Sequence, residues 1–310
     1  MSPSEEASGE QQVLIVKRHH GLPYSRGLMA QSMMAAGLTP VRAYDLARQV
    51  GERLVDRSAR EVGVGELRRL AERVVEEQEG PRAVSRFRQW QRLNRSARPL
   101  IVLIGGATGT GKSTLASLLA HRLGVNRIAA TDMVRHVLRA CFNPHFMPDV
   151  HVSSFEVGAA VRLRAHERED PDMVGFLRQV ENVSTGVNAL LERAIVERTP
   201  MIIEGVHLVP GLLPEFGDRA LVVPLVLTVA DEERHRAHLT MRGGMSARPT
   251  ERYLRRFDTI RKLQSYLVAR ASDKGVPILD NDDMDTALFA LTELVLQALA
   301  DSQPETAAVD

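Results

Sequence analysis

The chain contains 310 residues, 44% of them hydrophobic and 25% charged, and carries a formal net charge of +1. Such values are typical of a globular protein with one α/β core and a smaller module. They argue against a strongly basic nucleic-acid binder, and no apolar run approaches the roughly 20 residues that a membrane helix requires. The single cysteine, Cys141, rules out an internal disulfide framework and favours a cytoplasmic protein. We expect a small-molecule partner, neither nucleic acid nor membrane, and a homo-oligomer stays open.

The first part of the chain predicts a small, mostly helical module over residues 13–80. Residues 1–12 are polar and acidic and predict a disordered tail, whereas the β-branched run 13–16 predicts a strand followed by a loop at 19–23. Helices are expected over residues 28–36, after Thr39 as N-cap, and over residues 66–78. Gly80 and Pro81 break the pattern, and the arginine-rich amphipathic segment 81–99 predicts a connection between domains.

From residue 100 the pattern alternates between apolar strands and helices, which predicts a parallel sheet covered by helices on both faces. Strands are expected at residues 100–104, 127–130, 201–204, 220–229 and 276–279. Helices are expected from Lys112, from Asp132, over residues 174–198, between residues 231 and 270, and over residues 284–300.

A glycine-rich loop joins the first of these strands to its helix and matches the G-x-x-x-x-G-K-S/T pattern in full. Glycines let the backbone amides face phosphates, and the helix N-terminus adds its positive dipole end. Lys112 would reach the β- and γ-phosphates of ATP, and Ser113 would hold Mg²⁺. The sequence thus predicts an α/β P-loop kinase domain over residues 100–302, followed by a tail at 303–310. The expected nucleotide contacts are Gly106, Ala107, Thr108, Gly109, Thr110, Gly111, Lys112, Ser113 and Thr114.

Polar residues follow the next two strands along the chain. Asp132 can orient an acceptor hydroxyl, with Arg135 and Arg139 after it on the same helix, but an ordinary helix N-cap with a solvated arginine face is the competing interpretation. Glu204 closes an apolar strand, where a carboxylate would ligate Mg²⁺ or position water. His207 is a candidate substrate contact or, equally, a hydrogen-bonded structural residue.

Residues 231–270 are helical and basic, and the pair Gly243-Gly244 interrupts them. Such a segment predicts a hinged lid that closes over ATP and brings arginine to the transferring phosphoryl group. Arg242 and Arg248 flank the glycine pair and are the arginines that we expect to reach the phosphates.

Five stretches together resemble one family, the 2-phosphoglycerate kinases, in which a P-loop kinase domain follows a module similar to an ATP-cone. The stretches are residues 23–27, the phosphate loop with 131–135, and residues 179–183, 202–211 and 248–254. The resemblance implies transfer of the ATP γ-phosphoryl group to the 3-hydroxyl of 2-phosphoglycerate, giving 2,3-bisphosphoglycerate and ADP with Mg²⁺. It also implies a cationic acceptor pocket, which Arg135, Arg139 and Arg178 could supply with the lid arginines.

The amino-terminal module departs from the ATP-cone pattern at one point. Lys17 and Arg18 match the start of its nucleotide-binding strand, but His19 and His20 stand where Asp or Asn is more typical. A regulatory nucleotide site and a merely basic strand end are both open. Two alternatives for the whole chain also stay open: a kinase for another small phosphorylated or carboxylated alcohol, and a nucleotide-sensing regulatory protein without catalysis.

Overall fold

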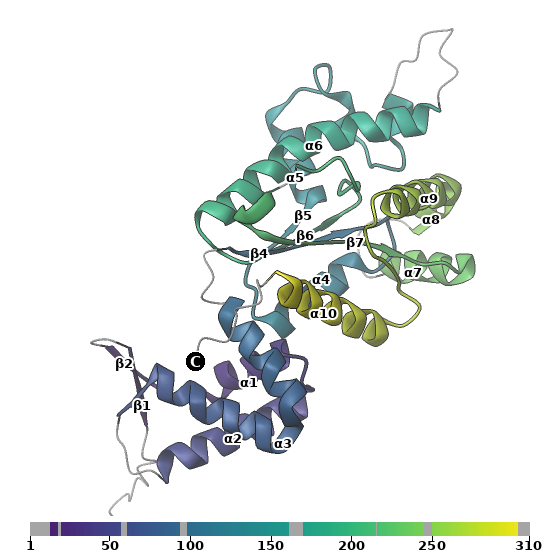
Figure 1. The fold of residues 1–310 in the computed structure, drawn as a ribbon. Coiled ribbons are helices and arrows are strands. Elements are labelled where there is room, and N and C mark those ends of the chain that lie inside the picture. The colour runs from purple at the N-terminus through teal and green to yellow at the C-terminus, as the bar shows by residue number, and fades with distance from the viewer. Residues whose placement is uncertain are drawn as a thin grey trace, which may run out of the picture. The chain divides into compact units, whose positions relative to one another are not determined.

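The computed structural model describes residues 13–17, 20–56, 61–93, 98–160, 170–214, 216–244 and 250–302. The chain divides into two compact units, Met1–Arg92 and Leu93–Asp310, and each is considered by itself (Figure 1). None of the described helices combines the length and the apolar character needed to cross a membrane.

The first unit contains a three-stranded sheet in the order β2-β1-β3. Strand β1 (Leu14–Lys17) pairs antiparallel with β2 (His20–Pro23) and parallel with β3 (Glu61–Gly63). The expectation of a loop at residues 19–23 was therefore wrong for residues 20–23. They form a strand because β1 offers them a hairpin partner, and Pro23 sits at the strand end, where a missing N–H is tolerated.

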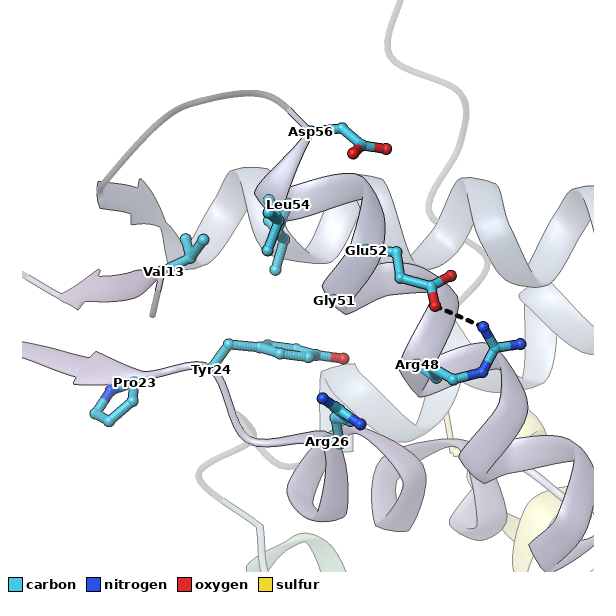
Figure 2. A pocket seen from close by; sticks show the side chains of 10 residues that line it. Val13, Pro23, Tyr24, Arg26, Arg48, Gly51, Glu52, Leu54 and Asp56 are labelled. Atoms are coloured by element: carbon cyan, nitrogen blue, oxygen red, sulfur yellow. Dashed lines mark hydrogen bonds and ion pairs between the residues drawn. The ribbon is translucent and has the colours of Figure 1, made fainter. Parts of the chain in front are cut away.

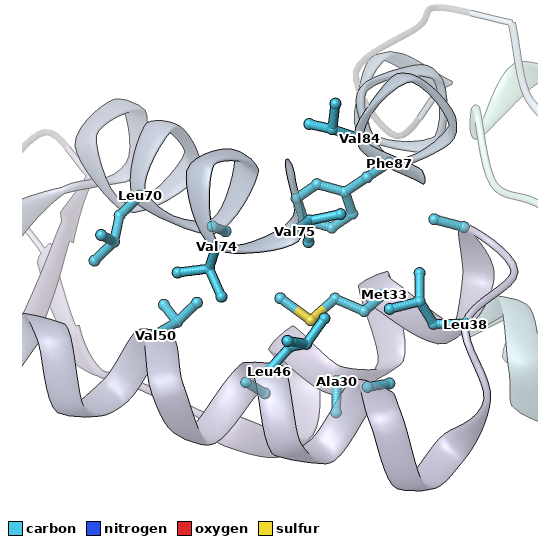
Figure 3. Packing of buried hydrophobic residues seen from close by; sticks show 14 of the residues in the cluster. Ala30, Met33, Leu38, Leu46, Val50, Leu70, Val74, Val75, Val84 and Phe87 are labelled. Carbon is cyan, nitrogen blue, oxygen red and sulfur yellow. The ribbon is translucent and has the colours of Figure 1, made fainter. Parts of the chain in front are cut away.

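Three helices complete this unit: α1 (Arg26–Ala35), α2 (Pro40–Val55) and α3 (Val64–Leu93). Helix α2 starts with Pro40 directly after Thr39, as the sequence predicts. Helix α3 is kinked at Gly80, whose φ of 83° is readily accessible only to glycine. The core lies between the helices (Figure 3), and Val84 and Phe87 of the expected connecting segment pack into it.

The second unit is built on a five-stranded parallel sheet in the order β5-β6-β4-β7-β8, which confirms the predicted fold class. Its strands are β4 (Leu100–Gly105), β5 (Ile128–Ala130), β6 (Met201–Gly205), β7 (Leu221–Thr228) and β8 (Ile278–Asp280). Every residue of the central strand β4 is buried, because helices cover both faces. Strands β6 and β7 lie on opposite sides of β4 in the sheet, so the strand order reverses at β4. A ligand-binding crevice is therefore expected at the carboxyl end of β4.

Helices α4 (Lys112–Leu123) and α10 (Met284–Asp301) lie on one face of the sheet, and α5 (Thr131–Cys141) and α6 (Pro171–Val196) on the other (Figure 1). Helices α7 (Glu232–Gly244), α8 (Thr250–Arg255) and α9 (Phe257–Asp273) follow β7. Helix α7 runs through the pair Gly243-Gly244 and ends there, so the glycines terminate the helix. The remaining elements are the short helices η1 (Pro148–His151), η2 (Val157–Ala160) and η3 (Gly217–Arg219).

Candidate active site

The glycine-rich loop between β4 and α4 wraps around the N-terminus of α4, and glycine occupies the positions where the backbone has a positive φ. Gly109 and Gly111 have φ values of 88° and 87°, and a Cβ on Gly109 would lie 2.6 Å from the Leu239 side chain. Lys112 begins the helix and is buried, with its Nζ donating to the Ala107 carbonyl at 2.6 Å. The loop therefore holds a cation and a helix N-terminus at one place, which is an arrangement suited to phosphate.

Three side chains from distant parts of the sequence hold this loop by its carbonyl groups. Nε2 of His235 lies 2.8 Å from the Thr108 oxygen, Nδ1 of His238 lies 3.3 Å from the Gly109 oxygen, and Nδ2 of Asn281 donates to the Thr110 oxygen at 2.9 Å. Burial is the main influence that lowers the pKa of His235, so its ring is neutral at pH 7. The sequence analysis did not identify these residues, although His235 and His238 at i, i+3 on the helix after β7 were a usable signal.

Ser113 and Glu204 meet at the carboxyl ends of β4 and β6. The Ser113 hydroxyl donates to Oε1 of Glu204 at 2.8 Å, and the Glu204 side chain is buried. These are hard oxygen ligands of the kind that Mg²⁺ prefers, usually together with phosphate oxygens. The two residues expected to hold Mg²⁺ thus lie in direct contact. No cluster of three or more His, Cys, Asp or Glu side chains with metal-site spacing occurs in the described part of the chain.

Asp132 and Arg135 are neighbours on α5 that differ in exposure. Asp132 is 48% exposed, whereas Arg135 is only 5% exposed and donates from Nη1 to the carbonyls of Val150 at 3.0 Å and Val152 at 2.9 Å. Nε of Arg135 donates to Oδ1 of Asp132 at 3.2 Å. Burial by itself raises the pKa of the Asp132 carboxyl, but the neighbouring His207, Arg135 and Lys112 outweigh it and hold that pKa below its usual range. Asp132 is therefore a carboxylate at neutral pH.

His207 lies inside the protein, between β6 and the helices of the α5–α6 face. Its Nδ1 is 2.7 Å from the Thr131 hydroxyl and its Nε2 is 3.0 Å from Oε1 of Gln179. Burial lowers the pKa of His207 to about 4, although Asp132 acts in the opposite direction. A side chain that is 1% exposed is not positioned to touch a substrate, so the geometry favours the structural interpretation over the expected substrate contact.

Two cavities both have Lys112 and Ser113 in their linings. One, of about 470 Å³, lies between the glycine-rich loop, Thr114, His238 and Met241 of α7, and residues 281–284. The other, of about 400 Å³, is lined by Thr108, Asp132, Met133, His136, Glu204 and neighbouring residues. The phosphate-binding end of the loop is shared, so a donor in one cavity and an acceptor in the other would meet there.

The remaining basic candidates differ in where they lie. Arg139 is exposed on α5, seven positions after Asp132 and so on the same helix face, and Arg178 is exposed on α6. His136, which the sequence analysis did not identify, lies on this face four positions after Asp132 and lines the same cavity as Asp132. The Arg242 and Lys17 side chains, and the whole of Arg18 and Arg248, lie outside the described residues.

A separate cavity of about 460 Å³ lies in the first unit, between the end of β2 and helix α2 (Figure 2). Tyr24 lines it and donates its hydroxyl to the Ala47 carbonyl at 2.7 Å, and burial raises the pKa of that phenol. Gly51 makes room for the ring, since a Cβ there would lie 3.0 Å from Tyr24 Cε1. Arg26 and Arg48 place charge at the wall, and Arg48 pairs with Glu52 at 2.6 Å.

Comparison with solved structures and family models adds little to this geometry. A gluconokinase from Sinorhizobium meliloti 1021 covers 66% of this chain and 93% of its own, with a TM-score of 0.35 and 13% identity, a likeness too weak to bear on fold or function. No family model matches the chain.

Curated relatives match the chain almost from end to end. The 2-phosphoglycerate kinase of Methanopyrus kandleri is 35% identical over 296 residues, covering 94% of this chain and 90% of the relative. Those of Methanococcus maripaludis strain C7 and Thermococcus kodakarensis are 32% and 36% identical, covering 94% and 90% of this chain and 95% and 94% of the relatives. The chain belongs to the 2-phosphoglycerate kinase family.

Proposed function

We propose that the protein transfers the γ-phosphoryl group of ATP to the 3-hydroxyl of 2-phosphoglycerate, giving 2,3-bisphosphoglycerate and ADP. One observation carries the proposal: in a chain whose relatives are named 2-phosphoglycerate kinases, two cavities meet at Lys112 and Ser113. The cavity beside Met241 and Met284 has the apolar wall that a nucleoside requires. The cavity beside Asp132 and His136 has the polar wall that a small phosphorylated acid requires.

Phosphoryl transfer asks mainly for positioning and charge compensation. The loop amides and Lys112 would bind the β- and γ-phosphates, and the side chain of Asp132 would accept a hydrogen bond from the acceptor hydroxyl. As the hydroxyl oxygen bonds to the γ-phosphorus, the bond to the β,γ-bridging oxygen breaks, and the Asp132 carboxylate takes the hydroxyl proton. A carboxylate with a depressed pKa is a weak base, which suits a reaction whose transition state develops little charge on the attacking oxygen.

Ser113 and Glu204 are the residues that would hold Mg²⁺. The ion would neutralise phosphate charge when bound with ATP. The hydrogen bond between the Ser113 hydroxyl and the Glu204 carboxylate keeps these two oxygen groups together at the carboxyl ends of β4 and β6.

The acceptor carries a carboxylate and a phosphate, so cations must surround it. Lys112 and His136 line its cavity, and Arg139 lies on the same face of α5. We propose that these side chains bind the acceptor, joined by Arg178, and that Arg242 and Arg248 approach the phosphates from the lid. Arg135 serves the site differently, because its guanidinium is directed at Asp132 and at backbone carbonyls.

The decisive experiment is ADP release by the purified protein with Mg-ATP, measured with 2-phosphoglycerate, with 3-phosphoglycerate and with no acceptor. We expect release that depends on 2-phosphoglycerate and is weak with its isomer. Release that depends on another phosphorylated or carboxylated alcohol would move the proposal to that acceptor. ATP binding without any acceptor-dependent release would favour a nucleotide sensor.

The amino-terminal unit is proposed to bind a regulatory nucleotide through Lys17 and Arg18. The support is the cavity beside Tyr24, whose wall combines apolar surface with Arg26 and Arg48. Titration of the full-length protein with ATP after replacement of Lys112 tests this proposal. ATP binding that persists in the first unit would use a site other than the glycine-rich loop.

A further inference from the structure

We propose that Thr131, His207 and Gln179 form a buried hydrogen-bonded chain whose function is to position Asp132 for the acceptor. The inference rests on the proposed function and deepens it by naming residues that act through Asp132 without touching the substrate. The chain joins α5, the end of β6, and α6, three elements far apart in sequence.

The direction of each hydrogen bond follows from the amide of Gln179. Its Nε2 donates to the carbonyl oxygens of Asp149 at 2.5 Å and Val152 at 3.1 Å, so its Oε1 is left as the acceptor. Nε2 of His207 must then carry a proton and donate to that oxygen. A neutral ring has its lone pair on Nδ1, which accepts from the Thr131 hydroxyl. Every polar atom of the chain thus has one assigned role.

Thr131 is fixed a second time, by its packing against Gly205. A Cβ on Gly205 would collide with the Thr131 hydroxyl, and the φ of 151° at Gly205 also disfavours a side chain there. The hydroxyl therefore fits between the Gly205 backbone and the His207 ring. Because Thr131 directly precedes Asp132 in the first turn of α5, fixing its side chain fixes the backbone that carries the carboxylate.

A parallel arm holds the Asp132 carboxylate itself. Arg135 donates to Oδ1 of Asp132 and to the carbonyls of Val150 and Val152, and Gln179 also donates to Val152. Both arms start from the same short backbone segment, residues 149–152, and end at Asp132 or its neighbour. The buried side chains of Arg135 and Gln179 thus both bind residues 149–152. Arg135 holds the carboxylate of Asp132 directly, and Gln179 holds its backbone through His207 and Thr131.

Packing alone would not require this construction. Burying an imidazole, an amide and a hydroxyl costs free energy unless each is hydrogen-bonded, and apolar residues of the same shape would be at least as stable. What the polar chain adds is direction, since hydrogen bonds hold a side chain to a narrow range of angles. The carboxylate beside it is the group in the acceptor cavity that gains from such precision.

The test uses Thr131→Val, which keeps the shape and removes the hydroxyl, and Thr131→Ser, which restores it. For Thr131→Val we expect kcat of acceptor-dependent ADP release to fall by about tenfold or more, with KM for ATP changed by less than about twofold. Thr131→Ser should remain within about threefold of the wild type. Thr292→Val is the matched control, because it removes a buried hydroxyl from α10 on the opposite face of the sheet and should leave kcat unchanged.

A double-mutant cycle shows whether Thr131 acts through Asp132. In an Asp132→Asn background, Thr131→Val should lower kcat by less than about twofold further, because the group that it positions is gone. An equal loss of kcat from Thr131→Val in both backgrounds would overturn the inference. A Thr131→Val protein with the kcat of the wild type would also overturn it, because the Thr131 hydroxyl would then not be needed.

Failure of the proposed reaction would look different. If the wild type shows no acceptor-dependent ADP release, the proposed reaction is wrong. The hydrogen bonds of His207 can then still be tested by ¹⁵N NMR of the full-length protein. A neutral His207 ring protonated on Nε2, with an Nδ1 resonance that shifts in Thr131→Val, supports the proposed hydrogen bonds. A charged ring or an Nδ1–H tautomer at neutral pH contradicts it.

Discussion

Lys112 shows how one residue is prepared for phosphate before any ligand arrives. Its ammonium group is buried and donates to the Ala107 carbonyl, within the loop whose amides would bind the phosphates. A buried cation is costly unless it is compensated, and the phosphates of ATP would add full negative charges to the partners that Lys112 already has. Lys112 is therefore positioned to bind an anion. Its replacement should lower kcat more than it lowers the stability of the fold.

We predict that Lys112→Ala lowers kcat for ADP release by at least about 100-fold, because it removes the point charge closest to the transferring group. Lys274→Ala, at an exposed lysine after α9, should be indistinguishable from the wild type. Circular dichroism would show that both variants are folded. A folded Lys112→Ala protein with near-normal turnover would mean that the nucleotide binds elsewhere.

His207 makes stability depend on pH in a calculable direction. Its pKa is about 4 in the folded protein against 6.5 for an ordinary histidine, so between these values only the unfolded state binds the proton. Stability is thus fully present above pH 6.5 and falls as the pH drops toward 4. At pH 5 the loss from this one group is about 2 kcal/mol.

Urea unfolding followed by circular dichroism at pH 7 and pH 5 tests this prediction. The free energy of unfolding of the wild type should fall between the two pH values by about 2 kcal/mol more than that of His207→Gln. His145→Gln, at an exposed histidine, should keep the wild-type pH dependence. Equal slopes for wild type and His207→Gln would show that His207 is not buried in the neutral form.

At the scale of elements, α7 supports the glycine-rich loop through side chains of its first two turns. His235 is fully buried and reaches the Thr108 carbonyl, and Arg261 of α9 lies 3.5 Å from its other ring nitrogen. Helix α7 is also the first part of residues 231–270, the segment expected to form the lid. Through His235 and His238, its first two turns contact the carbonyl groups of the loop.

We predict that His235→Leu raises KM for ATP by about tenfold, because it leaves the Thr108 carbonyl without its donor and loosens the loop. KM for the acceptor should change by less than about twofold. Thr240→Ala, an exposed position on the same helix, serves as control. A larger effect on the acceptor than on ATP would assign α7 to the wrong cavity.

Local patterns predicted the elements well, and contacts between distant residues poorly. The glycine-rich loop is contiguous in sequence, so a local pattern marks it, and its contacts with a nucleotide stay a prediction. By contrast, Asn281 reaches the Thr110 carbonyl from 171 positions away, and no local pattern marks it. Arg135 was grouped with Arg139, four positions along the same helix, and only the contacts of Arg135 with the distant carbonyls of Val150 and Val152 separate the buried arginine from the exposed one.

At the scale of the molecule, each unit has hydrophobic clusters of its own. One cluster of the first unit draws on residues 13–87 (Figure 3), and two clusters around the sheet draw on residues beyond 100. All residues that line the two cavities at Lys112 belong to the second unit. Stability of the first unit and catalysis should therefore respond to different substitutions.

Leu46→Ala separates the two. Leu46 is fully buried among the helices of the first unit, and such a truncation costs about 2 to 5 kcal/mol. In calorimetry we expect two transitions, with the one belonging to the first unit lowered by roughly 10 °C or more and the other unmoved. Below both transitions kcat should equal that of the wild type, whereas Leu28→Ala, 67% exposed, should move neither. A single transition that shifts as a whole would instead mean that the units unfold together, because only a stabilising contact between them could transmit the lost packing of Leu46 to the sheet.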